Sequence, residues 1–234
     1  MQNNPSWSPL RFTSTTQDSH APDLRILNKK ITHLIRSGRV DDAKQLFDEM
    51  TERNTVTWNS IITGYVQRRE MTKARKLFDE MPERDVVSWN LMISGYVSCR
   101  GSRYIEEGRY LFDRMPERDF VSWNTMITGY ARNGRMDEAF YLFNSMPKKN
   151  VVSWNAVISG FLHNAGDIVS AQELFDQMVD RDTFSWNTMI SGYVNMSDMD
   201  EASNLFCKMS DPDILSWNSM ISGFAHTEGC HRKT

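Results

Sequence analysis

Apolar residues recur along this chain at the spacing of an α-helix. The phrase at residues 121–130 reads Val-Ser-Trp-Asn-Thr-Met-Ile-Thr-Gly-Tyr. Its positions i, i+3, i+4 and i+7 hold Trp123, Met126, Ile127 and Tyr130. Apolar residues at this spacing line one side of a helix. Serine is favoured at the N-cap, so we expect the helix to begin at Ser122.

A second apolar stripe follows the first after a short break. Its members are Met136, Ala139, Leu142, Phe143 and Met146. Gly134 lies in the break and predicts the end of the first helix. Pro147 follows the second stripe and predicts its end. The segment is therefore expected to form two short amphipathic helices joined by a tight turn.

This pair of stripes is repeated along the chain. The Trp-Asn phrase begins at Trp58, Trp89, Trp123, Trp154, Trp186 and Trp217, and a degenerate copy begins at Leu27. The Trp-to-Trp spacings are 31, 34, 31, 32 and 31 residues. A fixed period of this size is typical of solenoids, in which neighbouring copies bury the apolar stripes that one copy cannot bury alone.

We therefore predict an all-α fold, an α-solenoid of stacked helix-turn-helix repeats. The expected repeats are residues 24–54, 55–85, 86–119, 120–150, 151–182 and 183–213, followed by a partial copy at 214–224. The longer copies carry three extra residues near Cys99–Tyr104 and one near Ala165. We expect both insertions to lie in the loop between the two helices. A glycine recurs on the first helix, as at Gly129, and predicts close approach between neighbouring helices.

The two ends of the chain lack this pattern. Residues 1–23 are rich in Ser, Thr, Asn and Pro and are expected to form a disordered leader. Its single basic residue, Arg11, is outnumbered by Asp18 and Asp23, so the leader has only part of the composition of a transit peptide. Residues 225–234 have no second apolar stripe and are expected to be a frayed tail.

Composition narrows the range of functions. The formal net charge is −3, whereas a nucleic-acid binder is expected to carry a basic patch, so any such patch must come from segregation of charge between faces. No run of eighteen apolar residues is present, so no membrane span is predicted. Three scattered cysteines give no disulfide framework and fit a reducing compartment.

An asparagine follows the tryptophan in every copy, although asparagine has poor helix propensity. This first row is Asn28, Asn59, Asn90, Asn124, Asn155, Asn187 and Asn218. A second polar row ends each repeat at Asn54, Asp85, Asp119, Asn150, Asp182 and Asp213. Two interpretations stand at this point. The rows either bond between helices and cap the next helix, or they line a groove and read the edge of a base.

The repeats resemble short, 31-residue pentatricopeptide repeats. The shared motif is Val-Ser-Trp-Asn-x-Met-Ile-x-Gly-Tyr followed by Asp-Glu-Ala-x-x-Leu-Phe-Asp-x-Met-Pro-Glu-Arg-Asp, over residues 24–224. The resemblance implies a right-handed superhelix that binds single-stranded RNA in plant organelles, in mitochondria more than in chloroplasts. It implies that residues matching Asn59 and Asp85 choose the base. It also implies residues that pack between bases, namely Val56, Val87, Val121, Val152 and Phe184.

Carried over copy by copy, the resemblance implies a base preference. The pairs Asn59/Asp85, Asn90/Asp119, Asn155/Asp182 and Asn187/Asp213 resemble the uracil-preferring combination. The pairs Asn28/Asn54 and Asn124/Asn150 resemble the cytosine-leaning one. The implied RNA is pyrimidine-rich, roughly CUUCUU from 5′ to 3′, and Asn218 has no partner in the second row.

Catalysis is not expected. The chain has no His-x-Glu and no Cys-x-x-Cys, the signatures of zinc-dependent deaminases, and Cys230 and His231 are adjacent rather than spaced for ligation. We therefore expect no metal, no cofactor and no enzyme activity, with editing or processing proteins acting in trans.

The alternative function is a protein-binding scaffold. An alanine followed four residues later by phenylalanine marks the second helices, as at Ala139/Phe143, and tetratricopeptide repeats share this pair. That family, however, keeps a length of 34 and has no fixed asparagine after the first-helix aromatic.

Overall fold

The structure is a computed structural model that describes residues 23–99 and 101–231. This part of the chain contains α-helices, one π-helical turn and no strand. The helices are α1 Leu24–Arg36, α2 Val40–Glu49, α3 Thr55–Gln67, α4 Met71–Glu80, α5 Val86–Ser98, α6 Ser102–Arg114, α7 Phe120–Arg132, α8 Met136–Ser145, α9 Val151–Gly160, α10 Ile168–Gln177, α11 Thr183–Asn195, α12 Met199–Lys208 and α13 Ile214–His231, with the π-helical turn η1 at Phe161–Ala165.

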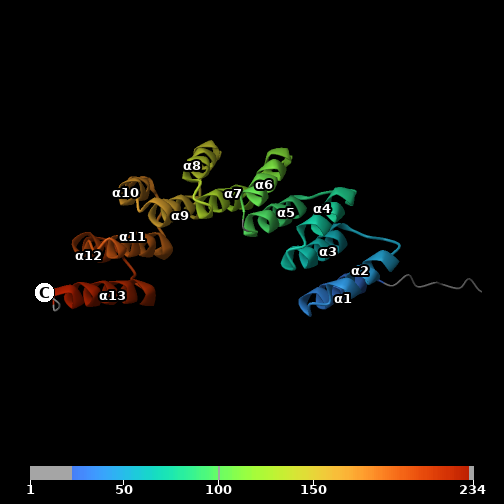
Figure 1. The fold of residues 1–234 in the computed structure, drawn as a ribbon, viewed down its shortest axis with the longest axis horizontal. Helices are drawn as coiled ribbons and strands as arrows, with labels where there is room; N and C mark the ends of the chain where they lie inside the picture. The colour runs from blue at the N-terminus through green and yellow to red at the C-terminus, as the bar shows by residue number, and fades with distance from the viewer. Residues whose placement is uncertain (1–22, 100, 232–234) are drawn as a thin grey trace, which may run out of the picture.

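The helices form an arch of two layers (Figure 1). Odd-numbered helices, the first of each repeat, lie towards the inside, and even-numbered helices lie outside, most clearly from α5 to α10. Each first helix contacts the next first helix, and each second helix also contacts the first helix of the following repeat. The inner layer is therefore continuous from α1 to α13, and the predicted all-α solenoid is confirmed.

The core runs along the seam between the layers. Seven members of the two predicted stripes are buried, namely Met126, Ile127, Tyr130, Ala139, Leu142, Phe143 and Met146, whereas Met136 is half-buried. Trp123 is half-buried and packs edge-on against Phe112 of the preceding repeat, with ring centroids 4.9 Å apart. Equivalent pairs occur at five other boundaries, from Phe47–Trp58 to Phe206–Trp217. The tryptophan therefore joins neighbouring repeats.

The recurrent glycine has the predicted role. A Cβ atom added to Gly129 would lie 2.7 Å from Val97 Cγ1 of the preceding repeat, closer than real side chains approach. Gly134, with φ of +73°, follows the end of α7 as expected. These two glycines set the spacing of the first helices and the turn after them.

The predicted start of the first helix is wrong. Helix α7 begins at Phe120 and its N-cap is Asp119, whose side chain accepts a hydrogen bond from the Ser122 main-chain N–H. Ser122 is therefore the third residue of the helix. The apolar stripe could not locate this start, because the first three helical residues do not belong to the stripe.

The predicted loop positions of both insertions are also wrong. The three extra residues extend α6, which has 13 residues where α4 and α8 have 10, so the turn before it keeps its length. The single extra residue is accommodated at the end of α9, where the helix widens into η1. A helix thus absorbs each insertion as an added turn or a π-turn.

The ends of the chain differ from expectation in one place. Helix α13 runs from Ile214 to His231, so residues 225–231 are helical where a frayed tail was expected. The expected leader, residues 1–23, lies outside the described residues except for Asp23, which caps α1. Residues 232–234 also lie outside them.

Candidate nucleic-acid interface

The two polar rows meet in pairs on the first-helix layer. In every complete repeat the asparagine Nδ2 donates a hydrogen bond to the last residue of the same repeat. The donor–acceptor distances are 3.2 Å for Asn28–Asn54, 3.5 Å for Asn59–Asp85, 3.1 Å for Asn90–Asp119, 3.3 Å for Asn124–Asn150, 3.2 Å for Asn155–Asp182 and 3.0 Å for Asn187–Asp213. The structure thus brings together the pairs that the sequence indicated.

The last residue of each repeat is also the N-cap of the next first helix. Asn150 Oδ1, for example, accepts from the Ser153 main-chain N–H at 2.9 Å, and the Asn150 main-chain N–H donates to Ser153 Oγ at 2.9 Å. This reciprocal arrangement is a capping box. The structural interpretation of the rows therefore holds. It leaves some second-row atoms without a described hydrogen bond, such as Asp182 Oδ2 and Asn150 Nδ2.

The asparagines of the first row are half-buried in most repeats. Asn155 is 6% exposed, whereas Asn218, which has no second-row partner, is exposed. In four repeats the asparagine Oδ1 is buried without a hydrogen-bond partner among the described residues. These repeats contain Asn59, Asn90, Asn124 and Asn155. The Oδ1 atom points inward, so Nδ2 is the amide atom that faces the second row.

The aspartates of the second row have lowered pKa values. Partial burial is the largest influence on Asp85, Asp119 and Asp182 and raises the pKa, but the combined hydrogen bonds from the serine three residues on and from the first-row asparagine outweigh it. For Asp213 the main-chain N–H of Ser216 is the largest cause of the lowered pKa. These carboxyls are therefore ionised at neutral pH and act as hydrogen-bond acceptors.

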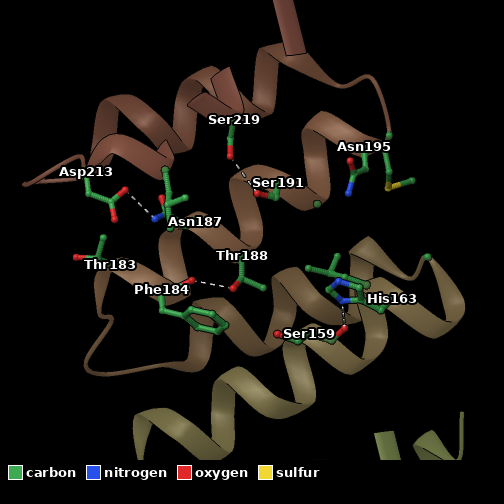
Figure 2. Close-up of a pocket in the computed structure, with 15 residues that line it drawn as sticks. Ser159, His163, Thr183, Phe184, Asn187, Thr188, Ser191, Asn195, Asp213 and Ser219 are labelled. Atoms are coloured by element: carbon green, nitrogen blue, oxygen red, sulfur yellow. Dashed lines mark hydrogen bonds between the residues drawn. The ribbon is translucent and has the colours of Figure 1, made fainter. Parts of the chain in front are cut away.

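Two neighbouring grooves open on the inner layer beside these pairs. One, of about 820 Å³, lies between α9, α11 and α13 and contains Asn187 and Asp213 in its wall (Figure 2). The other, of about 650 Å³, lies between α7, α9 and α11 and is lined by Asn155 and Asp182. Phe184 lines both grooves and points into the first one in Figure 2.

The residues expected to pack between bases are exposed on this layer. Their exposed fractions are 56% for Val56, 62% for Val87, 56% for Val121, 58% for Val152 and 60% for Phe184. Sequence reasoning missed Leu215, which is 64% exposed and lines the larger groove. Its place two residues after the second-row Asp213, the same as that of Val56 after Asn54, was the signal that could have identified it.

Basic residues accompany the inner layer at the ends of its helices. Arg132 lines the smaller groove, and His163 lines both grooves. Arg36 lines a third hollow, of about 260 Å³, between α1 and α3. Arg36 and Arg132 therefore place positive charge on this layer, which also carries the second-row carboxylates.

Neither a metal cluster nor a membrane-spanning helix occurs in the part of the chain that the structure describes. No group of three or more His, Cys, Asp or Glu side chains is arranged to hold a metal ion there. None of the helices described combines the length and the apolar character that crossing a membrane requires.

Curated relatives of the chain are plant proteins. The pentatricopeptide repeat-containing protein At1g62260, mitochondrial, of Arabidopsis thaliana is 63% identical over 125 residues, which are 53% of this chain and 19% of that protein. The pentatricopeptide repeat-containing protein DOT4, chloroplastic, of the same plant is 51% identical over 39 residues, 17% of this chain and 4% of that protein. The chain thus spans about a fifth of the first relative's length.

Solved structures share the fold. The maize protein PPR10 superposes with a TM-score of 0.64 at 20% identity, covering 88% of this chain and 32% of that one. PPR10 in complex with an 18-nt psaJ RNA element gives 0.52 at 17% identity, with coverage of 87% and 38%. A tetratricopeptide repeat protein from Parabacteroides merdae also gives 0.52, at 13% identity, with coverage of 89% and 87%.

Family comparison agrees with the geometry. The PPR repeat matches residues 31–55, 87–120, 121–151 and 152–183. The PPR repeat family matches residues 53–86 and 181–226. Together these matches run from residue 31 to residue 226 without a gap, and the chain belongs to the PPR repeat family.

Proposed function

We propose that this protein is a single-stranded RNA-binding adaptor that reads about one pyrimidine per repeat. The observation that carries the proposal is the pairing of the two polar rows beside inner grooves. Each pair offers hydrogen-bonding atoms, and an exposed apolar side chain lies beside it. RNA readers that take one base per helical repeat use this combination of edge contacts and packing.

The second row supplies a chemical reason for choosing between uracil and cytosine. In Asp182, Oδ1 already accepts from Asn155 and Ser185, and no described hydrogen bond uses Oδ2. A free carboxylate oxygen accepts from the N3–H of uracil. In Asn150, Oδ1 is used in the same way, so the free amide atom is Nδ2, a donor that suits the unprotonated N3 of cytosine.

The apolar side chains would hold the bases in register. Phe184 lies between the two large grooves, where a base can stack on its ring. Base–aromatic stacking stabilises a complex by about 1–3 kcal/mol per base. We therefore expect the nucleotides beside Phe184 to be held more tightly than those beside the valines.

The comparisons support the class of ligand and the location. The PPR10 structure that shares this fold contains RNA, and the relative matching half of this chain has a mitochondrial name. We place this protein in an organelle, the mitochondrion rather than the chloroplast. There it would act without catalysis of its own, in RNA editing or processing carried out by proteins recruited in trans.

The direct test compares two RNAs in a gel-shift titration. An RNA containing CUUCUU should bind more tightly than a purine RNA of the same length, and circular dichroism should show that the protein is folded. Equal binding of both RNAs, or no binding by folded protein, would refute base reading. It would favour the protein-binding scaffold, which makes no distinction between these RNAs.

Exchanging the second-row residues should exchange the base preferences. Asp182→Asn replaces a free acceptor by a free donor, and Asn150→Asp does the reverse, while both keep an N-cap oxygen. We expect the nucleotide paired with Asn155 to change from uracil towards cytosine, and the one paired with Asn124 from cytosine towards uracil, by about tenfold in relative Kd. Unchanged preferences in both variants would contradict the assignment.

A further inference from the structure

A buried hydroxyl recurs three residues after each second-row residue. The side chains are Thr57, Ser88, Ser122, Ser153, Ser185 and Ser216, and all have an exposed fraction of 0%. In five of the six, the hydroxyl oxygen accepts from the N-cap main-chain N–H, at 2.9–3.3 Å. This capping box uses only the oxygen, so the hydroxyl hydrogen is free to donate elsewhere.

The structure shows two destinations for that hydrogen. At two boundaries the nearest acceptor is the first-row asparagine of the preceding repeat. Thr57 Oγ1 lies 2.7 Å from Asn28 Oδ1, and Ser216 Oγ lies 2.7 Å from Asn187 Oδ1, with the N-cap Oδ1 slightly farther at 2.9 and 2.8 Å. At the other boundaries the hydrogen goes to the N-cap residue, as from Ser185 Oγ to Asp182 Oδ1 at 2.7 Å.

The second arrangement occurs wherever the preceding first-row asparagine has a buried Oδ1 without a hydrogen-bond partner among the described residues. These asparagines are Asn59, Asn90, Asn124 and Asn155. Each precedes one of the four hydroxyls that donate to the N-cap residue. A buried amide oxygen without a donor is unfavourable. A hydroxyl rotates readily between two acceptors, so the same hydroxyl can serve either one.

We propose that this hydroxyl is a positioning residue for base reading. By donating to Oδ1 of the preceding repeat's asparagine, it keeps the amide oriented with Nδ2 towards the second row and the groove. The proposal rests on the proposed function, which gives the amide its ligand. Without the hydroxyl, the amide is held through Nδ2 alone and samples other rotamers, so it no longer presents one fixed donor to a base.

The test removes one hydroxyl and measures selectivity. Ser216→Ala should lower the discrimination between uracil and other bases at the nucleotide paired with Asn187 by about threefold to tenfold, the equivalent of one lost hydrogen bond. Ser216→Thr, which keeps the hydroxyl, should restore it. Ser170→Ala is the matched control, because Ser170 bonds to the N-cap Asp167 through N–H and Oγ in the same way but on the outer helix α10.

A purely structural role predicts a different result. If Ser216→Ala and Ser170→Ala lower the melting temperature alike and both leave base discrimination unchanged, the positioning role is overturned. An RNA-free measurement keeps the test independent of the proposed function. By NMR, the side-chain amide protons of Asn187 should exchange with water faster in Ser216→Ala than in the unmodified protein and in Ser170→Ala.

The two measurements distinguish a failure of the proposed function from a failure of the positioning role. If the unmodified protein does not discriminate between bases, the proposed function fails, and amide exchange still decides whether the hydroxyl fixes the asparagine. If the unmodified protein discriminates and Ser216→Ala changes neither the Kd ratio nor the exchange rate, only the positioning role is overturned.

Discussion

At the scale of single residues, second-row aspartates link helix capping to pH. The pKa of the Asp182 carboxyl is lowered in the folded protein, since the hydrogen bonds from Ser185 and Asn155 outweigh the effect of burial. The pKa is also lowered at Asp85, Asp119 and Asp213. A group whose pKa is lower in the folded state stabilises the protein above its unfolded pKa, near 3.9 for aspartate, and this contribution disappears as the pH falls through the folded value.

We therefore expect acid sensitivity that asparagine removes in part. The melting temperature should fall as the pH drops below about 4, and the fall should be smaller in Asp182→Asn. Asparagine accepts the Ser185 N–H bond without titrating, as Asn54 and Asn150 already do at their boundaries. Circular dichroism melts at several pH values measure this difference. An equal acid-induced fall in both proteins would show that the capping carboxylate does not contribute.

Sequence reasoning located these residues but not their bonding. The period identified both rows, because a polar residue at a fixed slot of a helical repeat stands out. It could not show that Asn155 donates to Asp182 across the repeat, since that contact depends on how neighbouring repeats pack. The capping role of Ser185 was missed because the predicted helix start was wrong. A serine directly before the tryptophan is expected to be the N-cap, whereas Asp182 is the N-cap and Ser185 is the third residue of α11.

At the scale of helices, two glycines should respond oppositely to alanine. Gly129 lies where an added Cβ would be 2.7 Å from Val97 Cγ1, so Gly129→Ala should destabilise the protein by about 1–3 kcal/mol. Gly108 on α6 occupies the slot filled by Ala74 and Ala139 in other repeats, and its added Cβ would meet Val97 at 3.5 Å, an ordinary contact. Gly108→Ala should therefore stabilise α6 by up to about 1 kcal/mol. Chemical denaturation measures both changes, and the same sign in both would contradict this account.

An arginine follows the second helix in four of the six complete repeats, and Lys149 and Pro212 take its place in the other two. Arg118 Nε donates to the Phe112 carbonyl at 2.9 Å, a second guanidinium nitrogen donates to the Asp113 carbonyl, and the group stacks on the Phe112 ring. Lys149 takes this place after α8, with Nζ 5.0 Å from the Phe143 ring centroid. The planar fork of arginine satisfies helix-end carbonyls that a lysine ammonium satisfies less well.

Lys149→Arg should accordingly stabilise the protein. We expect a gain of about 0.5–1.5 kcal/mol, measured as a higher midpoint in urea, from hydrogen bonds to helix-end carbonyls such as those that Arg118 makes. The reverse change, Arg118→Lys, should lower the midpoint by a similar amount. A urea midpoint that is unchanged in both variants would show that these hydrogen bonds add no stability beyond that of the positive charge.

The helix-level predictions failed where the chain could absorb extra residues in more than one way. The three residues near Cys99–Tyr104 could lengthen a loop or a helix, and the period does not distinguish these outcomes. They lengthen α6 because Tyr104 and Ile105 continue its face, where Ile105 is buried and Tyr104 packs near Tyr96. The single extra residue near Ala165 becomes a π-turn for a similar reason, since it keeps Ile168 in line with the next core.

At the scale of the whole molecule, the stack could be predicted from its period, whereas the distribution of charge could not. The net charge of −3 argued against nucleic acid. The structure shows that many charged residues form ion pairs on the outer helices, such as Arg109–Asp113 and Arg75–Asp79. The inner layer has Arg36 and Arg132 beside its hollows, and it also carries the second-row aspartates. In the proposed complex few phosphates would therefore be neutralised, and base contacts would supply much of the binding.

This distribution predicts a shallow salt dependence of RNA binding. If about two phosphates are neutralised, the slope of log K against log salt for single-stranded RNA is about −1.4, which lowers affinity about sevenfold between 50 and 200 mM salt. Arg132→Ala should reduce the slope by about 0.7. Lys76→Ala on α4, the outer helix, should leave the slope unchanged. A steep slope that both variants reduce equally would place the RNA on the outer layer, because only there does Lys76 lie within reach of a phosphate.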